Sequence, residues 1–478
     1  MRCLLIFLCV CSALLYGEEP KVYTNKGEVT IGGERIPYTV KMGNYPLVDE
    51  NKKQTGTIYW ISYTKDVKEP SSRPLSFCFN GGPGSSSIWL HLGALSPRKI
   101  AFNEQGFELN SLETEENPFS ILNVCDLVFI DPVSTGYSRA MDGEEKQFHG
   151  VEADVKAVAE CIRRYTTEYK RWASPKFLIG ESYGTTRAAC LSSYLKERYF
   201  MNLNGVVLVS MALNFQTFLF EFGNDLPFVT FLPTYTANAW YHKKLSPDLM
   251  QDLHQALAES SQYALGEYTH ALMKGDALND QEEKVVASKL ARLTGLSEKT
   301  IKDSNLRVCP KLFRQELLEG KILGRFDGRL SGFRAGIGKE CIDYDPSTEC
   351  SFPAFTSVFN HYVANTLQWE SQEEYQVLTN VFPWDFGKAK NRYLNVSQDL
   401  REAIIANPLM RVLVMSGYYD LALPFMGAEY TIDHLYLPKE LRGNVEMEYY
   451  PSGHMMYLHQ PSLKKMHADL VRFISTQK

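Results

Sequence analysis

A serine flanked by glycines is the residue of this chain with the clearest potential as a nucleophile. Ser182 is the centre of residues 180–184, Gly-Glu-Ser-Tyr-Gly, which follow the apolar run 176–179 and precede a helix-like segment at 185–198. A strand, a sharp turn and a helix in this order are typical of a nucleophile elbow, whose glycines permit a strained turn that presents the serine hydroxyl. The pentapeptide alone occurs by chance in roughly one chain in ten of this length. Other residues must therefore support the assignment.

A base and an acid are needed to activate such a serine, and on this scaffold they follow it in the order acid, then base. Asp420 lies on a loop after the apolar run 411–415, and His454 lies in the tight loop 451–456 after the alternating segment 445–450. Both are exits from strand-like segments, where a side chain can reach a neighbouring strand's serine. The sequence therefore predicts a triad of Ser182, Asp420 and His454.

Two residues compete for these roles. His459 is close to His454, but residues 458–461 are typical of a loop before the last helix. Asp131 ends the apolar run 127–130 and precedes Ser182, which is the wrong order for the acid on this scaffold. The sequence favours His454 and Asp420 over both.

A second glycine-rich segment, residues 79–87, follows the apolar run 75–79. A phosphate-binding loop would end in Gly-Lys-Ser/Thr, which is absent here. An acyl-transfer enzyme instead needs two N–H donors for the developing oxyanion, one after the nucleophile and one from an earlier strand-to-helix loop. Tyr183 and Gly82 are the expected oxyanion hole.

Several segments in the same order, residues 80–87, 131–138, 180–184 and 453–455 together with Asp420, resemble the serine carboxypeptidases. The resemblance covers most of the chain from about residue 30, is weakest between about 245 and 350, and at residues 231–235 is most similar to bacterial members. It implies an α/β-hydrolase fold with no cofactor, the same triad and oxyanion hole, and a set that binds the C-terminal carboxylate of a peptide. That set is Asn80, Gly81 and Glu181.

Glu181 is expected to make the binding of the substrate's carboxylate depend on pH. Two carboxylates share a hydrogen bond only if one is protonated, so a buried Glu181 is expected to bind peptides best on the acidic side. Many members carry a second acid near this glutamate, whereas this chain has Ala94 there by direct count or His91 with a gap. An acidic pH preference therefore does not carry over from the resemblance. Ser85 and Phe79 also replace a common cysteine and a common tryptophan.

The cysteines and the first residues bear on the cellular compartment. Residues 1–17 have a basic start and a short apolar core, which predicts a secretory signal too short to span a membrane. Export would place the protein in the periplasm or medium of a bacterium, or in the secretory, lysosomal or vacuolar route of a eukaryote. Seven cysteines follow, of which Cys78 and Cys125 are expected as buried thiols, and Cys341 and Cys350 as the favoured bridge. The single glycosylation sequon is residues 395–397.

Composition excludes several classes of function. The net charge is -6, and no basic cluster suggests nucleic acid. No HExxH or paired-cysteine spacing suggests a metal. With 44% hydrophobic residues, the chain can form a large core.

The expected organisation is a signal at 1–17, a hydrolase core at 18–213, a largely helical cap at 214–370 and the rest of the core at 371–478. Residues 27–65 alternate as antiparallel strands that lead into a mostly parallel sheet, and 247–259 and 280–294 are helical. The cap aromatics Phe231, Tyr235 and Trp240 either line the substrate pocket or pack inside the cap.

The function that these features favour is an exported serine-type carboxypeptidase acting on free peptide C-termini. Asn80 and Glu181 favour it over an esterase or acyltransferase on the same scaffold. The intact triad argues against a non-catalytic binding protein. The sequence leaves the oligomeric state open.

Overall fold

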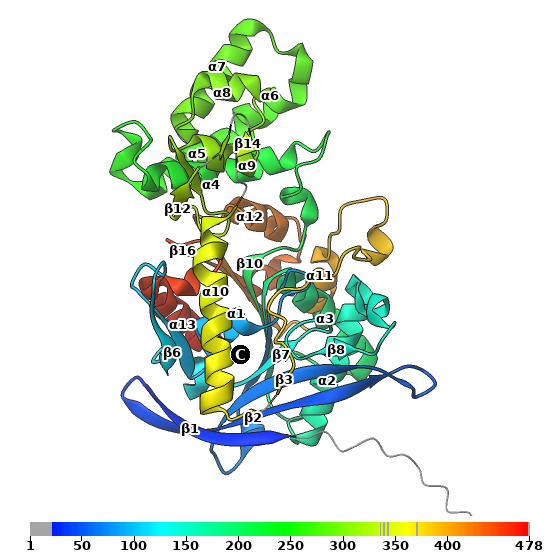
Figure 1. Ribbon diagram of the computed structural model, residues 1–478. Helices are drawn as coiled ribbons and strands as arrows, with labels where there is room; N and C mark the ends of the chain where they lie inside the picture. The colour runs from blue at the N-terminus through cyan, green and yellow to red at the C-terminus, as the bar shows by residue number, and fades with distance from the viewer. Residues whose placement is uncertain (1–21, 335, 338–339, 342–343, 370, 477–478) are drawn as a thin grey trace, which may run out of the picture.

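The computed structural model describes residues 22–334, 336–337, 340–341, 344–369 and 371–476. One sheet forms its centre, with the strand order β1-β2-β3-β7-β4-β9-β10-β15-β16 (Figure 1). The strands are β1 (Tyr23–Ile31), β2 (Glu34–Val48), β3 (Gln54–Lys65), β4 (Leu75–Phe79), β7 (Asp126–Asp131), β9 (Lys176–Ser182), β10 (Gly205–Met211), β15 (Arg411–Gly417) and β16 (Val445–Tyr450). The short strand β8 (Arg139–Ala140) pairs with β3.

The sheet is antiparallel at one end and parallel over the rest. Strand β2 lies between β1 and β3, and β3 lies between β2 and β7; all three of these pairs are antiparallel. From β7 onward every pair is parallel, through β4, β9, β10 and β15 to β16. The predicted antiparallel lead-in and mostly parallel sheet are confirmed. Together with a strand, turn and helix around Ser182, this topology is the α/β-hydrolase fold.

Helices cover both faces of the sheet because successive strand residues point to opposite sides. In β9, Phe177 and Ile179 join one core cluster while Leu178 joins the other. The first cluster includes residues of α10 (Pro346–His361) and α13 (Gln460–Ser475). The second includes residues of α2 (Val151–Glu168), α3 (Tyr183–Tyr199), α11 (Ser397–Ala406) and α12 (Phe425–Asp433). Figure 1 shows α10 and α13 on one side of the sheet and α2 and α3 on the other.

A helical region with its own apolar core lies between β10 and β15, above the sheet in Figure 1. Its helices are α4 (Leu226–Tyr241), α5 (Leu253–Tyr263), α6 (Thr269–Lys274), α7 (Asp280–Thr294), α8 (Glu298–Asp303) and α9 (Pro310–Glu316). Helix α7 has the predicted bounds because Asn279 and Glu282 form a capping box and Gly295, at φ 71°, ends it. The cap boundaries at 214 and 370 stay a prediction, and α10 within them packs on the sheet.

Short strands complete the fold. They are β5 (Arg98–Phe102) with β6 (Leu109–Glu116), β11 (Lys321–Leu323) with β12 (Ser331–Phe333), and β13 (Gly336–Ile337) with β14 (Glu340–Cys341). Helix α1 (Ile88–Leu90) follows the glycine-rich loop.

The three cap aromatics join one apolar cluster. Phe231 and Tyr235 are buried, and Tyr235 stacks on Phe313 with ring centroids 4.3 Å apart. Its hydroxyl donates to the Val308 carbonyl at 3.0 Å. Trp240 packs against the same cluster. The packing alternative is therefore confirmed for Phe231 and Tyr235, whereas a pocket-lining role of the partly buried Trp240 stays a prediction.

The cysteine predictions have mixed outcomes. Cys78 and Cys125 are buried free thiols, as expected. Cys350 is also a free thiol, so it does not form the expected bridge, and the side chain of Cys341 lies outside the described residues. The signal at 1–17 lies outside them as well. Among the described helices, none combines the length and the apolarity needed to cross a membrane.

Candidate active site

The predicted site residues gather at one edge of the sheet. Strands β4, β9, β15 and β16 are parallel, so their carboxyl ends lie on the same side. Asn80 follows β4, Ser182 ends β9, Asp420 follows β15 and His454 follows β16. In open α/β sheets this edge is where ligands bind.

Ser182 has the backbone of a nucleophile elbow. Its φ is 59° and its ψ is -129°, a conformation that a residue with a side chain rarely adopts. The flanking glycines leave no room for side chains, because a Cβ on Gly180 would lie 2.3 Å from the Gly184 carbonyl oxygen and one on Gly184 would lie 2.7 Å from that of Phe79. The strand therefore turns sharply into α3 and leaves Ser182 partly exposed.

The strained backbone at Ser182 predicts a difference in stability between two variants of this residue. Glycine adopts this conformation without the Cβ penalty, so Ser182→Gly should be more stable than Ser182→Ala by about 1 kcal/mol. Thermal and urea unfolding of the two inactive variants would measure the difference. A glycine variant that is the less stable of the two would contradict strain at this residue.

His454 and Asp420 form a buried pair. The distance from His454 Nδ1 to Asp420 Oδ2 is 2.7 Å, and Asp420 Oδ1 accepts the backbone N–H groups of Ala422 at 2.8 Å and Leu423 at 3.0 Å. The carboxylate thus holds the proton of His454 on Nδ1 and leaves Nε2 to act as a base. Burial lowers the pKa of His454, but the charge and hydrogen bond of Asp420 and the charge of Glu181 together raise it above 6.5.

The cap contributes a residue that holds His454, and sequence reasoning missed it. The His454 N–H donates to the Phe326 carbonyl at 2.6 Å, and the two rings stack with centroids 4.8 Å apart. The His454 carbonyl in turn accepts the Ser210 hydroxyl at 2.7 Å. Phe326 lies where the family resemblance is weakest, so no motif signalled it.

The glycine-rich loop packs against the start of α3. A Cβ on Gly81 would lie 2.4 Å from the backbone nitrogen of Tyr183, so only glycine allows this approach. Tyr183 is the first residue of α3, where a helix leaves N–H groups without helical acceptors and carries a partial positive charge. Gly82 is exposed beside it. This corner can stabilise an anionic oxygen.

Glu181 lies beneath the same corner and is buried, with 2% of its surface exposed. Burial raises its pKa to about 7, although the charge of His454 and hydrogen bonds from Tyr457 and Asn80 oppose the rise. Burial, with a smaller contribution from the charge of Asp420, therefore supplies the raised pKa that the missing second acid was expected to provide. The carboxyl can be protonated below neutral pH without that acid.

Arg187 is a second residue that sequence reasoning missed. It is buried on α3, its Nη1 donates to the Asn80 carbonyl at 2.7 Å, and its Nε donates to Asp154 Oδ2 at 2.7 Å. Its guanidinium also lies 5.3 Å from the centre of the Phe79 ring. A charged residue on the buried face of the helix after the elbow was the available signal.

The competing base and acid hydrogen-bond to residues outside the predicted triad. His459 Nδ1 is 2.8 Å from the Ser462 hydroxyl at the start of α13, and burial lowers its pKa to about 4. Asp131 is buried and accepts the Ser87 N–H at 2.8 Å. Each of these two side chains is held by a hydrogen bond to a residue outside the predicted triad.

His91 and Ala94, the two residues considered in place of the second acid, also have hydrogen-bond partners of their own. His91 Nε2 is 2.7 Å from the Tyr63 hydroxyl, and burial lowers its pKa to about 3. Ala94 is buried, and its carbonyl accepts the Asn117 amide at 2.8 Å. Ser85, in place of a cysteine, accepts the Trp89 indole N–H at 2.8 Å.

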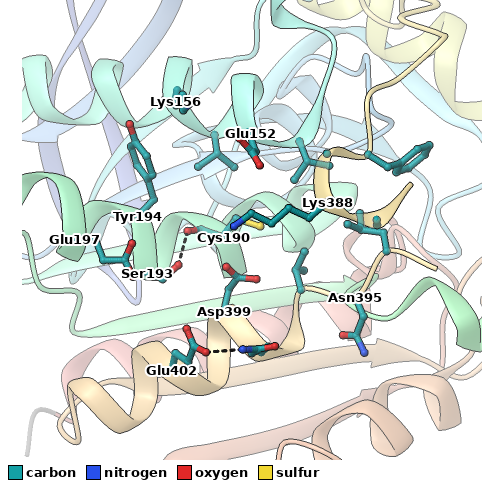
Figure 2. Close-up of a pocket in the computed structure, with 18 of the residues that line it drawn as sticks. Glu152, Lys156, Cys190, Ser193, Tyr194, Glu197, Lys388, Asn395, Asp399 and Glu402 are labelled. Atoms are coloured by element: carbon teal, nitrogen blue, oxygen red, sulfur yellow. Dashed lines mark hydrogen bonds between the residues drawn. The ribbon is translucent and has the colours of Figure 1, made fainter. Parts of the chain in front are cut away.

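A hollow of about 500 Å³ lies away from the triad, between α2, α3 and α11 (Figure 2). Glu152, Lys156, Lys388 and Asp399 are among its lining residues, and Ser182, Asp420 and His454 are not. Within the described part of the chain, no three His, Cys, Asp or Glu side chains are grouped as metal ligands.

Comparison with known proteins identifies the family. A model of the serine carboxypeptidase family matches residues 39–462. The chain belongs to the serine carboxypeptidase family. This match spans all the predicted site residues, from Asn80 to His454.

Individual relatives are distant. "Serine carboxypeptidase-like 20" of Arabidopsis thaliana is 27% identical over 35% of this chain and 32% of its own length. "Serine carboxypeptidase S10 family member 1" of Dictyostelium discoideum is 24% identical over 36% and 39%. "Carboxypeptidase Y homolog A" of Ajellomyces capsulatus is 26% identical over 33% and 27%. The matched stretches span well under half of these relatives.

Two solved structures have still lower identity. A thermostable carboxyl esterase from Bacillus coagulans has a TM-score of 0.40 at 12% identity and covers 91% of this chain and 97% of its own. Proline iminopeptidase of Mycobacterium smegmatis has a TM-score of 0.39 at 13% identity, covering 94% and 97%. The fold assignment rests on the strand order and the elbow.

Proposed function

We propose that the chain is an exported serine-type carboxypeptidase that hydrolyses the last peptide bond of peptides with a free C-terminus. Membership of the serine carboxypeptidase family supports this activity. The buried His454–Asp420 pair and the strained Ser182 at the same sheet edge supply the groups that the reaction needs.

The proposed reaction has two halves. Ser182 Oγ attacks the scissile carbonyl carbon while His454 Nε2 takes its proton, and the N–H groups of Gly82 and Tyr183 stabilise the oxyanion. The C–N bond breaks when His454 gives that proton to the leaving amino acid. Water then loses a proton to His454, attacks the acyl-enzyme and releases the shortened peptide, and the proton returns to Ser182. Asp420 holds the imidazole tautomer throughout.

The observation that carries the peptidase assignment is a protonatable carboxyl next to the nucleophile. Glu181 precedes Ser182, is buried and has a pKa of about 7. Asn80 Oδ1 accepts the Leu90 N–H at 3.0 Å, so the two hydrogens of its NH₂ group are left to donate, one to the Tyr457 oxygen and one to Glu181 or to an anion that takes its place. A protonated Glu181, the Asn80 amide and the Gly81 N–H would bind a terminal carboxylate, which an ordinary esterase does not need.

The direct test compares an N-blocked dipeptide with its C-terminal amide from pH 4 to 9, using wild type and Ser182→Ala. We expect a preference for the free acid at acidic pH that weakens as the pH rises through 7, because Glu181 loses its proton there. No turnover is expected in the variant. Cleavage restricted to simple esters would overturn the peptidase proposal and favour an esterase.

Glu181→Gln separates carboxylate binding from chemistry. The amide can donate to the substrate but cannot share a carboxyl proton, so kcat/KM for the free acid should fall about tenfold at pH 5 and lose its decline near pH 7. An ester without a free carboxylate should change less than twofold. Steady-state kinetics on both substrates measure this, and equal losses on both would contradict the role.

Export is proposed on the basic start and apolar core of residues 1–17. Fractionation of cells that express the full chain, with N-terminal sequencing of the mature protein, would test it. A cytoplasmic protein that retains Met1 would contradict it.

A further inference from the structure

Glu181 has a buried partner that neither the motifs nor the family match signalled. The Tyr457 hydroxyl donates to Glu181 Oε2 at 2.8 Å, and Tyr457 has no exposed surface. Tyr457 lies three residues after His454, in the short helical turn Met456–Leu458. The loop that carries the expected base therefore also carries the hydrogen-bond partner of the expected carboxylate-binding acid.

The chain makes room for this tyrosine at one position. A Cβ on Gly93 would lie 2.4 Å from Tyr457 Cε2, so only glycine allows the ring to occupy this place. Gly93 lies between His91 and Ala94, the two positions considered for the missing second acid. The segment that could have supplied a carboxyl group instead accommodates the ring of Tyr457.

The direction of the hydrogen bond is fixed by Asn80. Its Oδ1 accepts the Leu90 N–H, and its amide hydrogen-bonds to the Tyr457 oxygen, which leaves the Tyr457 proton for Glu181. Burial raises the pKa of Tyr457 well above 10, so the hydroxyl keeps its proton. Glu181 Oε2 is thus an acceptor in either protonation state.

We propose that Tyr457 is a positioning residue that keeps the acidic proton of Glu181 on Oε1, where it can bind the terminal carboxylate of the substrate. Oε2 accepts the hydroxyl, and a carboxylic acid carries its proton on one oxygen only. This inference rests on the proposed function, because it requires Glu181 to bind a carboxylate.

Two consequences follow for Tyr457→Phe, which retains the ring beside Gly93. The proton of Glu181 is no longer directed to one oxygen, so KM for a free-acid dipeptide should rise three- to tenfold at pH 5 with little change in kcat. The lost donor also stabilised the charged form of Glu181, so its pKa should rise by about one unit. The alkaline decline in kcat/KM for the free acid should therefore move up by about one pH unit.

The other groups that face Glu181 remain in the variant. The charge of His454 lowers the pKa of Glu181, the charge of Asp420 raises it, and the hydrogen bond from Asn80 lowers it. Because the charges of His454 and Glu181 influence each other, the pH profile of kcat/KM gives apparent pKa values that belong to the pair. The measured quantity is the shift between wild type and variant, in which these three groups are constant.

Tyr450→Phe is the matched control. The Tyr450 hydroxyl also donates to a carboxylate from a buried position, to Asp469 Oδ2 at 2.7 Å, and Asp469 is not among the groups that affect the pKa of Glu181. Tyr450→Phe should lower the free energy of unfolding about as much as Tyr457→Phe, because each variant loses one buried hydrogen bond. It should leave the pH profile of kcat/KM unchanged. Neither variant should change kcat/KM for the C-terminal amide substrate, because it has no free carboxylate.

The outcomes separate this inference from the proposed function. A wild-type enzyme without preference for the free acid would overturn both. A wild-type preference with an unshifted alkaline decline in Tyr457→Phe would overturn only the role of Tyr457. Equal losses on the acid and amide substrates would show that Tyr457 serves structure alone.

Discussion

Replacement of Ser182 by alanine is expected to lower kcat for an N-blocked dipeptide by about a million-fold. The variant keeps the Cβ and the strained backbone of the elbow, whose φ is 59°, and loses only the oxygen that forms the acyl-enzyme. His454 and Asp420 keep their 2.7 Å contact, so the fold and the base remain. Kinetics beside thermal unfolding would separate lost chemistry from lost structure.

The double variant Ser182→Ala, His454→Ala should be no slower than Ser182→Ala alone, because residues that act as one unit lose their effect together. A serine-directed phosphonate should label the wild type at Ser182, as mass spectrometry of peptides would show, and should not label the alanine variant. Retained turnover in a folded Ser182→Ala, or labelling of another serine, would contradict the assignment of the nucleophile.

The positions of these residues could be predicted because parallel strands bring the exits of 176–179, 411–415 and 445–450 to one edge. Apolar runs bounded by Gly and Pro marked those strands, and the chain order of acid and base selected Asp420 over Asp131. Local signals were equally informative in α7, where the capping box and Gly295 fixed both ends of the helix.

What could not be predicted depends on contacts between distant segments. Phe326 reaches His454 from the cap, Arg187 supports Asn80 across the sheet edge, and Tyr457 reaches Glu181 only because Gly93 leaves space. None of these pairs has a spacing or period that sequence reasoning can detect. The sequence also left open whether Tyr235 lines a pocket or packs in the cap, because its partner Phe313 lies 78 positions away in a region without a regular apolar pattern.

Asp420→Asn is the second change with a large expected effect, a fall in kcat of about ten-thousand-fold near neutral pH. The two backbone N–H groups of Ala422 and Leu423 hold one carboxylate oxygen, and an asparagine would satisfy them only with its own oxygen. Its NH₂ would then face His454 Nδ1, which must accept a hydrogen bond. The imidazole proton would move to Nε2, and His454 could no longer take the proton of Ser182.

The tautomer makes this prediction specific. Asn and Asp have the same shape, so the variant should stay folded, and the ¹⁵N shifts of His454 should report a proton on Nε2 in place of Nδ1. Asp303→Asn is the matched control, since Asp303 is exposed and pairs only with Lys299 among the ion pairs described. It should leave kcat unchanged. Full activity in Asp420→Asn would mean that another group orients His454, and because Glu181 is the remaining carboxyl whose charge raises the pKa of His454, Glu181→Gln in that background would identify it.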